Sequence, residues 1–398
     1  MSARFCALNT LGYTRRFPKE TRAQPRLHSM DQTEDLPLLD RSMILLMPTK
    51  HMGNLLVALH SIETLATTNR GPTWVVVDES YRDIIESVPT IENPIYYPRA
   101  RLHKAGPLAK FRLLRGFYRQ LRATGAEHLL NFDALQVSSA IATMSGVTER
   151  WALGDTPRPS TYQQIIDRQP RDPHRFYHYH QYVQALLGQG SSPAYPALKP
   201  HSKHQLSTRE ALTEQGVDPD KPYVCMHAGA TKAYKQWPPE CFASIADWLD
   251  EQGIQVVFIG AGASDKTIIE QVRGTSRSQP ASLCNRLNLG ELITLFKQCR
   301  LFLGNDSGPM HLATASQTQV VALFGPTDYQ RWGPLGANAT LIHNPIPCTN
   351  SCSKKTCPEN FRCIKTLPVD LVRDTLTQYL HDSGSSSASA QARSAGVI

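Results

Sequence analysis

Short apolar runs alternate along this chain with segments in which apolar residues recur at helical spacing. The apolar runs predict strands at residues 42–47, 74–77, 129–132, 223–227, 254–259, 301–304 and 319–324. The helical spacing predicts helices at residues 55–65, 81–88, 138–144, 177–187, 239–252, 265–272, 290–299 and 311–316. Strands and helices that alternate in this way build parallel sheets covered by helices on both faces. The pattern therefore predicts an α/β protein with doubly wound sheets.

The predicted units fall into two sets, separated by residues 157–200, where Pro, His, Tyr and Gly are frequent. Two domains are expected because the chain has 398 residues and single cores rarely grow beyond roughly 250 residues. We place the boundary near residues 188–201. The expected parts are a basic, disordered extension (1–40), a first domain (41–200), a second domain (201–367), a final helix (368–381) and a disordered tail (382–398).

The formal charge of +8 is concentrated at the N-terminus, where residues 1–29 carry six basic residues against one acidic residue. This segment lacks the apolar core of a signal peptide, so we expect it to be disordered. An over-extended gene start, with Met30 as the true initiator, or a transit peptide would also fit its composition. No apolar run approaches the roughly 18 to 20 residues of a membrane helix, and a soluble protein is therefore expected.

The rest of the chain is mildly basic, which suits phosphorylated ligands or an anionic membrane face. No nucleic-acid-binding module is recognisable. Basic residues interleaved with aromatic ones gather within residues 99–122, at Arg101, Lys104, Lys110, Arg112, Arg115, Arg119 and Arg122. This segment is either a solvated helix face or a surface that meets an acidic acceptor.

The nine cysteines form two groups. Five are scattered and have the pattern of small core residues in a reducing compartment: Cys6, Cys225, Cys241, Cys284 and Cys299. Four cluster near the C-terminus, at Cys348, Cys352, Cys357 and Cys363. Their spacing is not that of paired CxxC zinc sites, so zinc binding, reduced packing thiols and a redox-labile disulfide all stay open.

The most informative stretch is residues 304–313, Gly-Asn-Asp-Ser-Gly-Pro-Met-His-Leu-Ala, between a predicted strand and a predicted helix. Asp306 or Ser307 can cap the helix, Gly308 lets a ligand approach the backbone, and Pro309 suits a first helical turn. The free N–H groups of such a turn attract anions, and phosphate is the natural ligand. The alternative is an ordinary capped helix start. A further strand-to-helix turn, Gly260-Ala261-Gly262, lacks the third glycine of a dinucleotide fingerprint, which disfavours a nicotinamide dehydrogenase.

Four segments together resemble glycosyltransferase family 9, the ADP-heptose:lipopolysaccharide heptosyltransferases. They are residues 304–313, residues 321–328 (Val-Ala-Leu-Phe-Gly-Pro-Thr-Asp), the Trp-Gly-Pro of residues 332–334 and the Lys-Gln-Trp-Pro of residues 235–238, and the C-terminal cysteines are similar to a pattern common in the family. The resemblance covers most of residues 41–381. It implies a GT-B architecture, with two facing Rossmann-like domains and a cleft between them.

The resemblance also implies an inverting transfer of heptose from ADP-heptose to an inner-core lipopolysaccharide sugar, without metal or cofactor. The acceptor would bind the first domain, the nucleotide sugar the second, and the final helix would cross back. The reaction would take place at the cytoplasmic face of the inner membrane. A related enzyme with another nucleotide sugar, and a nucleotide-sugar-binding protein without catalysis, are the alternatives.

An ADP-sugar leaves with its diphosphate, so a metal-independent transferase must neutralise that charge with helix N-termini and cations. The donor-site candidates are Thr231, Lys232, Lys235, Asp306, Ser307, Gly308 and His311. Lys235 would supply a mobile charge, and His311 would hydrogen-bond a phosphate or a sugar hydroxyl. Trp237 is expected in the core. No base partner for Ser307 is apparent, which argues against a serine hydrolase.

The first domain departs from the family pattern at Asn54, where the family typically has an aspartate as candidate general base. An amide cannot take a proton. Either Asn54 positions the acceptor while His51 or Asp133 serves as base, or the transition state needs little help from a base, or the protein is slow or inactive. We prefer His51, which lies in the same loop and has a suitable ordinary pKa.

Overall fold

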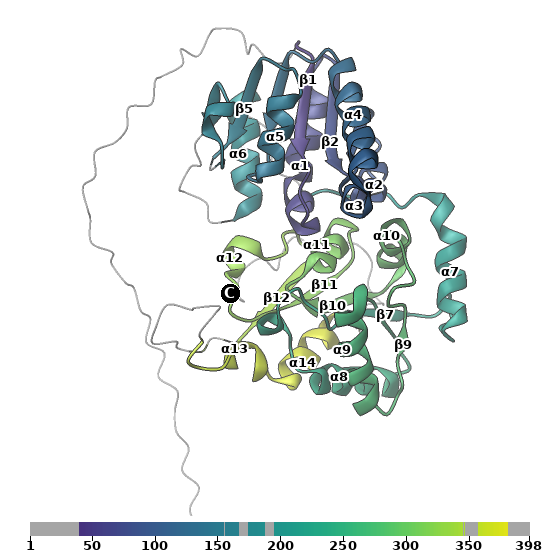
Figure 1. The fold of residues 1–398 in the computed structure, drawn as a ribbon. Helices are drawn as coiled ribbons and strands as arrows, with labels where there is room; N and C mark the ends of the chain where they lie inside the picture. The colour runs from purple at the N-terminus through teal and green to yellow at the C-terminus, as the bar shows by residue number, and fades with distance from the viewer. Residues whose placement is uncertain are drawn as a thin grey trace, which may run out of the picture. The chain divides into compact units, whose positions relative to one another are not determined.

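The structure is a computed structural model that describes residues 40–154, 156–166, 174–187, 195–344, 346 and 357–380 (Figure 1). The expected N-terminal extension, the expected tail, Cys6, Cys348 and Cys352 lie outside the described residues. Of the proposed domain boundary, only residues 195–201 are described.

The first sheet has six parallel strands in the order β3-β2-β1-β4-β5-β6. Its strands are β1 (Met43–Met47), β2 (Thr73–Asp78), β3 (Pro94–Tyr97), β4 (His128–Asn131), β5 (Glu149–Leu153) and β6 (Gln164–Ile166). The associated helices are α1 (Met52–Thr68), η1 (Glu79–Tyr81), α2 (Arg82–Glu86), α3 (Arg99–Lys104), α4 (Pro107–Ala123), α5 (Gln136–Met144), η2 (Pro159–Thr161) and α6 (Arg175–Leu187). This strand order is that of a Rossmann fold.

The second sheet repeats the same order with strands β12-β11-β10-β7-β8-β9, again all parallel. Its strands are β7 (Tyr223–His227), β8 (Gln255–Phe258), β9 (Ala281–Ser282), β10 (Leu301–Asn305), β11 (Val320–Phe324) and β12 (Ala339–His343). The helices are η3 (Ser202–His204), α7 (Gln205–Glu214), η4 (Ala233–Lys235), α8 (Pro239–Glu251), α9 (Gly262–Thr275), α10 (Leu289–Gln298), α11 (Gly308–Ala315), α12 (Tyr329–Trp332), α13 (Arg362–Lys365) and α14 (Val369–Leu380). The α/β class and the two doubly wound sheets are therefore confirmed.

Strand β1 is apolar at every position because helices cover both of its faces. In β1, Met43, Leu45 and Met47 pack with α1 in one core cluster, whereas Ile44 and Leu46 pack with α4 in another. The cluster around α1 continues into α11 of the second half. The expected final helix is present as α14, whose buried face joins the core of the second sheet. The domain limits themselves stay predictions.

Every strand predicted from an apolar run is present, and its ends shift by at most one residue. Strands β3, β5, β6, β9 and β12 were missed because they lie toward the sheet edges, and each contains positions that are partly or fully exposed, so that no continuous apolar run marks it. Helix α7 was missed because it is mostly polar and buries only Thr208 and Leu212. The loop expected over residues 48–54 is shorter, since α1 already begins at Met52.

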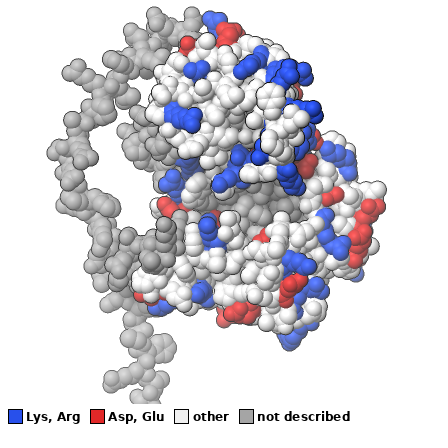
Figure 2. Space-filling view, in the orientation of Figure 1, with Lys and Arg blue, Asp and Glu red and all other residues white. Residues whose placement is uncertain are grey.

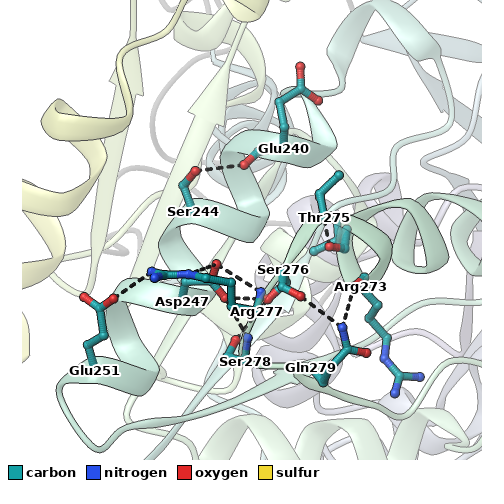
Figure 3. A network of polar contacts seen from close by, with 11 residues as sticks. Glu240, Ser244, Asp247, Glu251, Arg273, Thr275, Ser276, Arg277, Ser278 and Gln279 are labelled. Carbon is teal, nitrogen blue, oxygen red and sulfur yellow. Dashed lines mark hydrogen bonds and ion pairs between the residues drawn. The ribbon is translucent and has the colours of Figure 1, made fainter.

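A polar network ties the C-terminal end of α9 to α8 and so fixes the helix that carries Asp265 (Figure 3). Asp247 accepts hydrogen bonds from the Ser276 hydroxyl at 2.6 Å and from the Ser278 backbone N–H at 2.9 Å. Arg277 bridges Asp247 and Glu251, at 3.5 and 2.7 Å. Burial opposes ionisation of Asp247, but these hydrogen bonds outweigh it and hold the pKa of that carboxyl well below its usual range.

Among the helices that the structure describes, none combines the length and apolar character that a membrane span requires.

Candidate functional site

A cavity of about 410 Å³ lies at the carboxyl end of the second sheet. Its apolar wall comes from Ile259, Leu283, Leu287, Leu289 and Leu292. Polar groups line another part, at His227, Thr231, Ser264, Asp265 and Ser307. Gly308 and Pro309 belong to the first turn of α11, and Met52 of α1 is the contribution of the first half. An apolar wall facing a few polar groups is the usual construction of a small-molecule site.

The turn after β10 is held to the loop after β7 by a buried amide. The side chain of Asn305 donates to the carbonyl oxygen of Ala228 at 2.8 Å and accepts from the backbone N–H of Trp237 at 3.1 Å. Trp237 is fully buried, which confirms it as a core residue. The motif asparagine therefore fixes the geometry between the two loops that carry the candidate donor-site residues.

Lys235 and Asp306 form an ion pair across these loops, with Nζ and Oδ2 2.7 Å apart. The pair is largely enclosed, since the Lys235 and Asp306 side chains are 21% and 8% exposed. The sequence predicted both residues for the site but not this contact. Asp306 thus holds the ammonium group beside the N-terminus of α11, where free backbone N–H groups already favour an anion.

Ser307 occupies the N-cap position of α11, but its hydroxyl does not cap the helix. Its Oγ lies 3.0 Å from Nδ1 of His227, and Nε2 of His227 lies 3.2 Å from Oδ2 of Asp265. The expectation that Ser307 lacks a base partner is therefore wrong. The partner was hidden because His227 ends β7, which is distant in sequence but pairs directly with β10, so that Gly304 is in register with His227.

The contacts of the His227 ring define how Ser307 can bond to a ligand. An ionised Asp265 carboxylate can only accept hydrogen bonds. Burial opposes its ionisation, but the hydrogen bond from His227 keeps the pKa of this carboxyl low. Nε2 of His227 must then carry the proton, and Nδ1 accepts the proton of the Ser307 hydroxyl. The free lone pair of Ser307 Oγ is left to accept a hydrogen bond from a ligand hydroxyl.

Asp265→Asn is expected to raise the KM for the donor by about 3- to 10-fold, the worth of one oriented hydrogen bond. The backbone N–H of Ala261 also donates to Oδ2 of Asp265 at 2.9 Å, so the amide oxygen of the variant takes that position. It accepts from Nε2 more weakly than a carboxylate does, so the ring proton is held on Nε2 less firmly and the Ser307 lone pair is less well oriented toward the ligand. Initial rates at varied donor concentration measure the effect. Ser244→Ala, exposed on α8 and not part of the cavity lining, is the matched control and should leave KM unchanged. A KM for Asp265→Asn within two-fold of the unmodified protein would contradict this orientation of Ser307.

His311 does not line the cavity in the part of the chain that the structure describes. It is buried in α11, its Nδ1 lies 3.3 Å from the Tyr195 hydroxyl, and a Cβ on Gly53 would come within 3.0 Å of its ring. Burial lowers the pKa of His311 to about 4, against the opposing charge of Asp306. The imidazole is therefore neutral at pH 7, and Gly53 provides the space that the ring needs against α1.

The lowered pKa of His311 makes the folded protein sensitive to acid. His311 binds a proton near pH 6.5 in the unfolded chain and only near pH 4 in the folded chain. The stability that depends on its neutral imidazole is therefore fully present above pH 6.5 and is lost as the pH falls through 4. Relative to His311→Gln, the unfolding free energy of the unmodified protein should fall by about 3 kcal/mol between pH 7 and pH 4. Urea unfolding at each pH measures this difference. His103→Gln, on the exposed surface of α3, keeps His311 and should lose as much stability as the unmodified protein. An equal loss in His311→Gln would contradict the assignment.

In the first half, Arg99 connects the candidate acid–base residues. Its guanidinium pairs with Asp78 and donates to the carbonyl oxygen of Pro48. Burial, followed by the charges of Lys50 and Arg99, lowers the pKa of His51 below 6.5. Burial raises the pKa of Asp133 to about 6, although Arg99 is among the groups that oppose the rise. Both groups thus lie within the field of one arginine at the carboxyl end of the first sheet.

His51 and Asp133 differ in how a substrate could reach them. His51 is exposed at the N-cap of α1, next to the cavity-lining Met52. Asp133 is 7% exposed, and its Oδ2 has no hydrogen-bond partner among the described residues. Asn54 is partly buried in the first turn of α1, and within the described ranges its side chain makes no hydrogen bond.

Of the predicted donor-site residues, the structure brings Thr231, Ser307 and Gly308 to the cavity. Lys232 is exposed in the same loop and is absent from the cavity lining as far as the structure describes it. Sequence reasoning missed His227 and Asp265. The position of each residue relative to a strand could have indicated them. His227 is the last residue of β7 and Asp265 comes shortly after β8, and the carboxyl ends of neighbouring parallel strands converge.

Residues 114–361 match the family model described as glycosyltransferase family 9 (heptosyltransferase). Over 143 residues the chain is 32% identical to lipooligosaccharide heptosyltransferase 2 of Campylobacter jejuni, covering 35% of this chain and 45% of that protein. The chain spans less than half the length of several curated relatives that it matches.

Two solved structures share the fold. The glycosyl transferase family 9 protein from Veillonella parvula aligns with a TM-score of 0.76 at 20% identity, over 86% of this chain and 98% of that chain. The E. coli heptosyltransferase WaaC with ADP aligns with a TM-score of 0.65 at 17% identity, over 85% and 99%. The GT-B architecture expected from the sequence is thereby confirmed.

Proposed function

The chain belongs to glycosyltransferase family 9, and we propose that it transfers heptose from ADP-heptose to an inner-core lipopolysaccharide sugar with inversion. The observation that carries this proposal is the Lys235–Asp306 ion pair beside the N-terminus of α11, at the edge of a cavity with an apolar wall. The printed names of the relatives, lipooligosaccharide and lipopolysaccharide heptosyltransferases, support the choice of sugar and acceptor.

We propose that the diphosphate of the donor binds where Lys235 and the free N–H groups of α11 converge. Both stabilise negative charge, and the leaving diphosphate gains charge as the glycosidic bond breaks. The apolar wall formed by Leu283, Leu287, Leu289 and Leu292 suits the flat face of the nucleobase. Ser307, with a lone pair directed away from His227, suits a hydroxyl of the ribose or the sugar.

The acceptor half is proposed to be residues 41–200, and the donor half residues 201–367. Asn54 can orient the acceptor through its amide, and His51 is the proposed base that takes the proton of the attacking hydroxyl. Inversion requires that hydroxyl to attack from the side opposite the leaving diphosphate. We further propose that transfer proceeds without a metal, at the cytoplasmic face of the inner membrane.

Calorimetry with a panel of ADP- and UDP-sugars tests the donor part of the proposal. ADP-heptose is expected to bind most tightly, and Lys235→Met should weaken that binding. Tighter binding of a UDP-sugar would instead support the second candidate, a related transferase with another donor.

The Ser307–His227–Asp265 arrangement raises a third candidate, hydrolysis through a serine nucleophile, since the three groups are in hydrogen-bonding contact. A fluorophosphonate probe separates the two functions. The transferase proposal predicts no labelling at Ser307, whereas labelling that disappears in Ser307→Ala would favour the hydrolase.

A further inference from the structure

Helices α3 and α4 form a strongly basic surface, of which only Arg99 belongs to the candidate site described above. Residues 99–123 contain eight Lys and Arg residues and no Asp or Glu. Arg99 and Arg101 pair with carboxylates of residues 78 and 79. Five others have no ion pair among the described residues: Lys104, Lys110, Arg112, Arg115 and Arg119. Figure 2 shows blue residues gathered on the side of the first half where α3 and α4 lie.

The first turns of α4 are exposed to solvent. Every residue from 106 to 112 is exposed, and α4 becomes buried only at Phe117, Tyr118 and Leu121. A Cβ added at Gly106 would meet no atom within 4 Å. The N-terminal part of α4 is therefore open to solvent, whereas its C-terminal part packs on the first sheet.

Two large apolar side chains are exposed on these first turns of α4. Leu108 is 64% exposed and Phe111 is 62% exposed. Leu108 and Phe111 are three residues apart and so share one face of the helix. Arg112 follows Leu108 by four residues, and Arg115 follows Phe111 by four residues, so both arginines lie on the same face. Apolar side chains flanked by basic ones are the pattern of a helix that rests in the headgroup region of a bilayer.

We propose that α3 and the first turns of α4 dock the protein on an anionic lipid bilayer. Leu108 and Phe111 enter the headgroup region, and Lys104, Lys110, Arg112 and Arg115 face anionic headgroups. The charge is complementary to such a surface. A soluble anionic saccharide would account for the basic residues, but it would gain nothing from two exposed apolar side chains. This surface is separate from the donor cavity, and its lipid contact does not depend on transfer activity.

Flotation of the full-length protein with lipid vesicles tests the docking surface. We expect binding to vesicles of phosphatidylcholine with 30% phosphatidylglycerol by composition, weaker binding at high salt, and little binding to phosphatidylcholine alone. Leu108→Ser/Phe111→Ser should reduce the bound fraction by at least about 10-fold. The matched control is Leu206→Ser/Leu371→Ser, which removes two exposed apolar side chains from α7 and α14 and should bind as before.

A charge series completes the test. Lys110→Gln/Arg112→Gln/Arg115→Gln should also lose binding, whereas Arg273→Gln, exposed on α9, should not. Unchanged binding of Leu108→Ser/Phe111→Ser to the vesicles would overturn the proposal. Such binding would come from electrostatic attraction alone, for which the basic N-terminal segment is sufficient, and not from the apolar contact that we propose. With a deacylated, soluble acceptor the same variant should keep its rate of ADP release. A loss of binding to that acceptor would show that the surface binds saccharide, and would also overturn the proposal.

Discussion

Replacing Lys235 with methionine is expected to reduce the turnover number for sugar transfer by about 10²- to 10³-fold, the usual effect of removing one group that stabilises transition-state charge. Lys235 is the cation held beside the N-terminus of α11, where the departing diphosphate would develop its charge. Methionine keeps most of the apolar stem and removes only the ammonium group. Steady-state rates of ADP release at saturating donor and acceptor measure the change.

Loss of Lys235 also leaves the nearly buried Asp306 without its cation, and that alone can destabilise the fold. Lys235→Met/Asp306→Asn separates the two effects, because it removes both charges. We expect the double variant to recover stability in urea unfolding but not turnover. Lys232→Met, three residues earlier and exposed, should stay within a few-fold of the unmodified protein. Recovery of turnover in the double variant would mean that Lys235 acts on Asp306 and not on the leaving group.

His51→Ala is expected to reduce turnover by about 100-fold or more, the effect of removing a general base. His51 is exposed beside Met52, so an acceptor hydroxyl can reach it. Its pKa lies below 6.5, which leaves the imidazole unprotonated at pH 7. Turnover of the unmodified protein should therefore fall only as the pH drops below about 6.5, and His51→Ala should lose that dependence. Turnover within a few-fold of the unmodified protein would refute the assignment.

Asp133→Asn is the informative comparison, because it removes the other candidate base. Burial of Asp133 raises its pKa to about 6, so the carboxyl costs stability once it ionises as the pH rises through 6. The variant should be more stable than the unmodified protein at pH 8 by about 3 kcal/mol and no more stable at pH 4. Its turnover should change by only a few-fold. A loss of about 100-fold or more in this variant, with His51→Ala active, would transfer the role of base to Asp133.

Apolar patterning was sufficient to predict the central strands and the turn from β10 into α11. Strands such as β1 and β11 are buried at every position, so their sequence is uniformly apolar. Edge strands such as β6 and β9 are two or three residues long and only partly buried, and no periodic signal distinguishes them from loops. Trp237 was predicted correctly because a large aromatic residue before an amphipathic helix has few places outside the core.

The contacts within the site depend on strand order, which patterning does not provide. His227 meets Ser307 because β7 and β10 are neighbours in the sheet, although 80 residues separate the two side chains. His311 was expected to contact the ligand, but its position against Gly53 depends on how α1 meets α11. The exposed Leu108 and Phe111 occupy helical positions that patterning would assign to a core.

Acceptor-dependent release of ADP from ADP-heptose tests the central claim most directly. The purified full-length protein is incubated with ADP-heptose, with and without an inner-core lipopolysaccharide acceptor that lacks the added heptose. The account predicts ADP release only when the acceptor is present, together with an acceptor whose mass has increased by one heptose. Donor binding in calorimetry without acceptor-dependent release would contradict it, and would identify the chain as a nucleotide-sugar-binding protein without transferase activity.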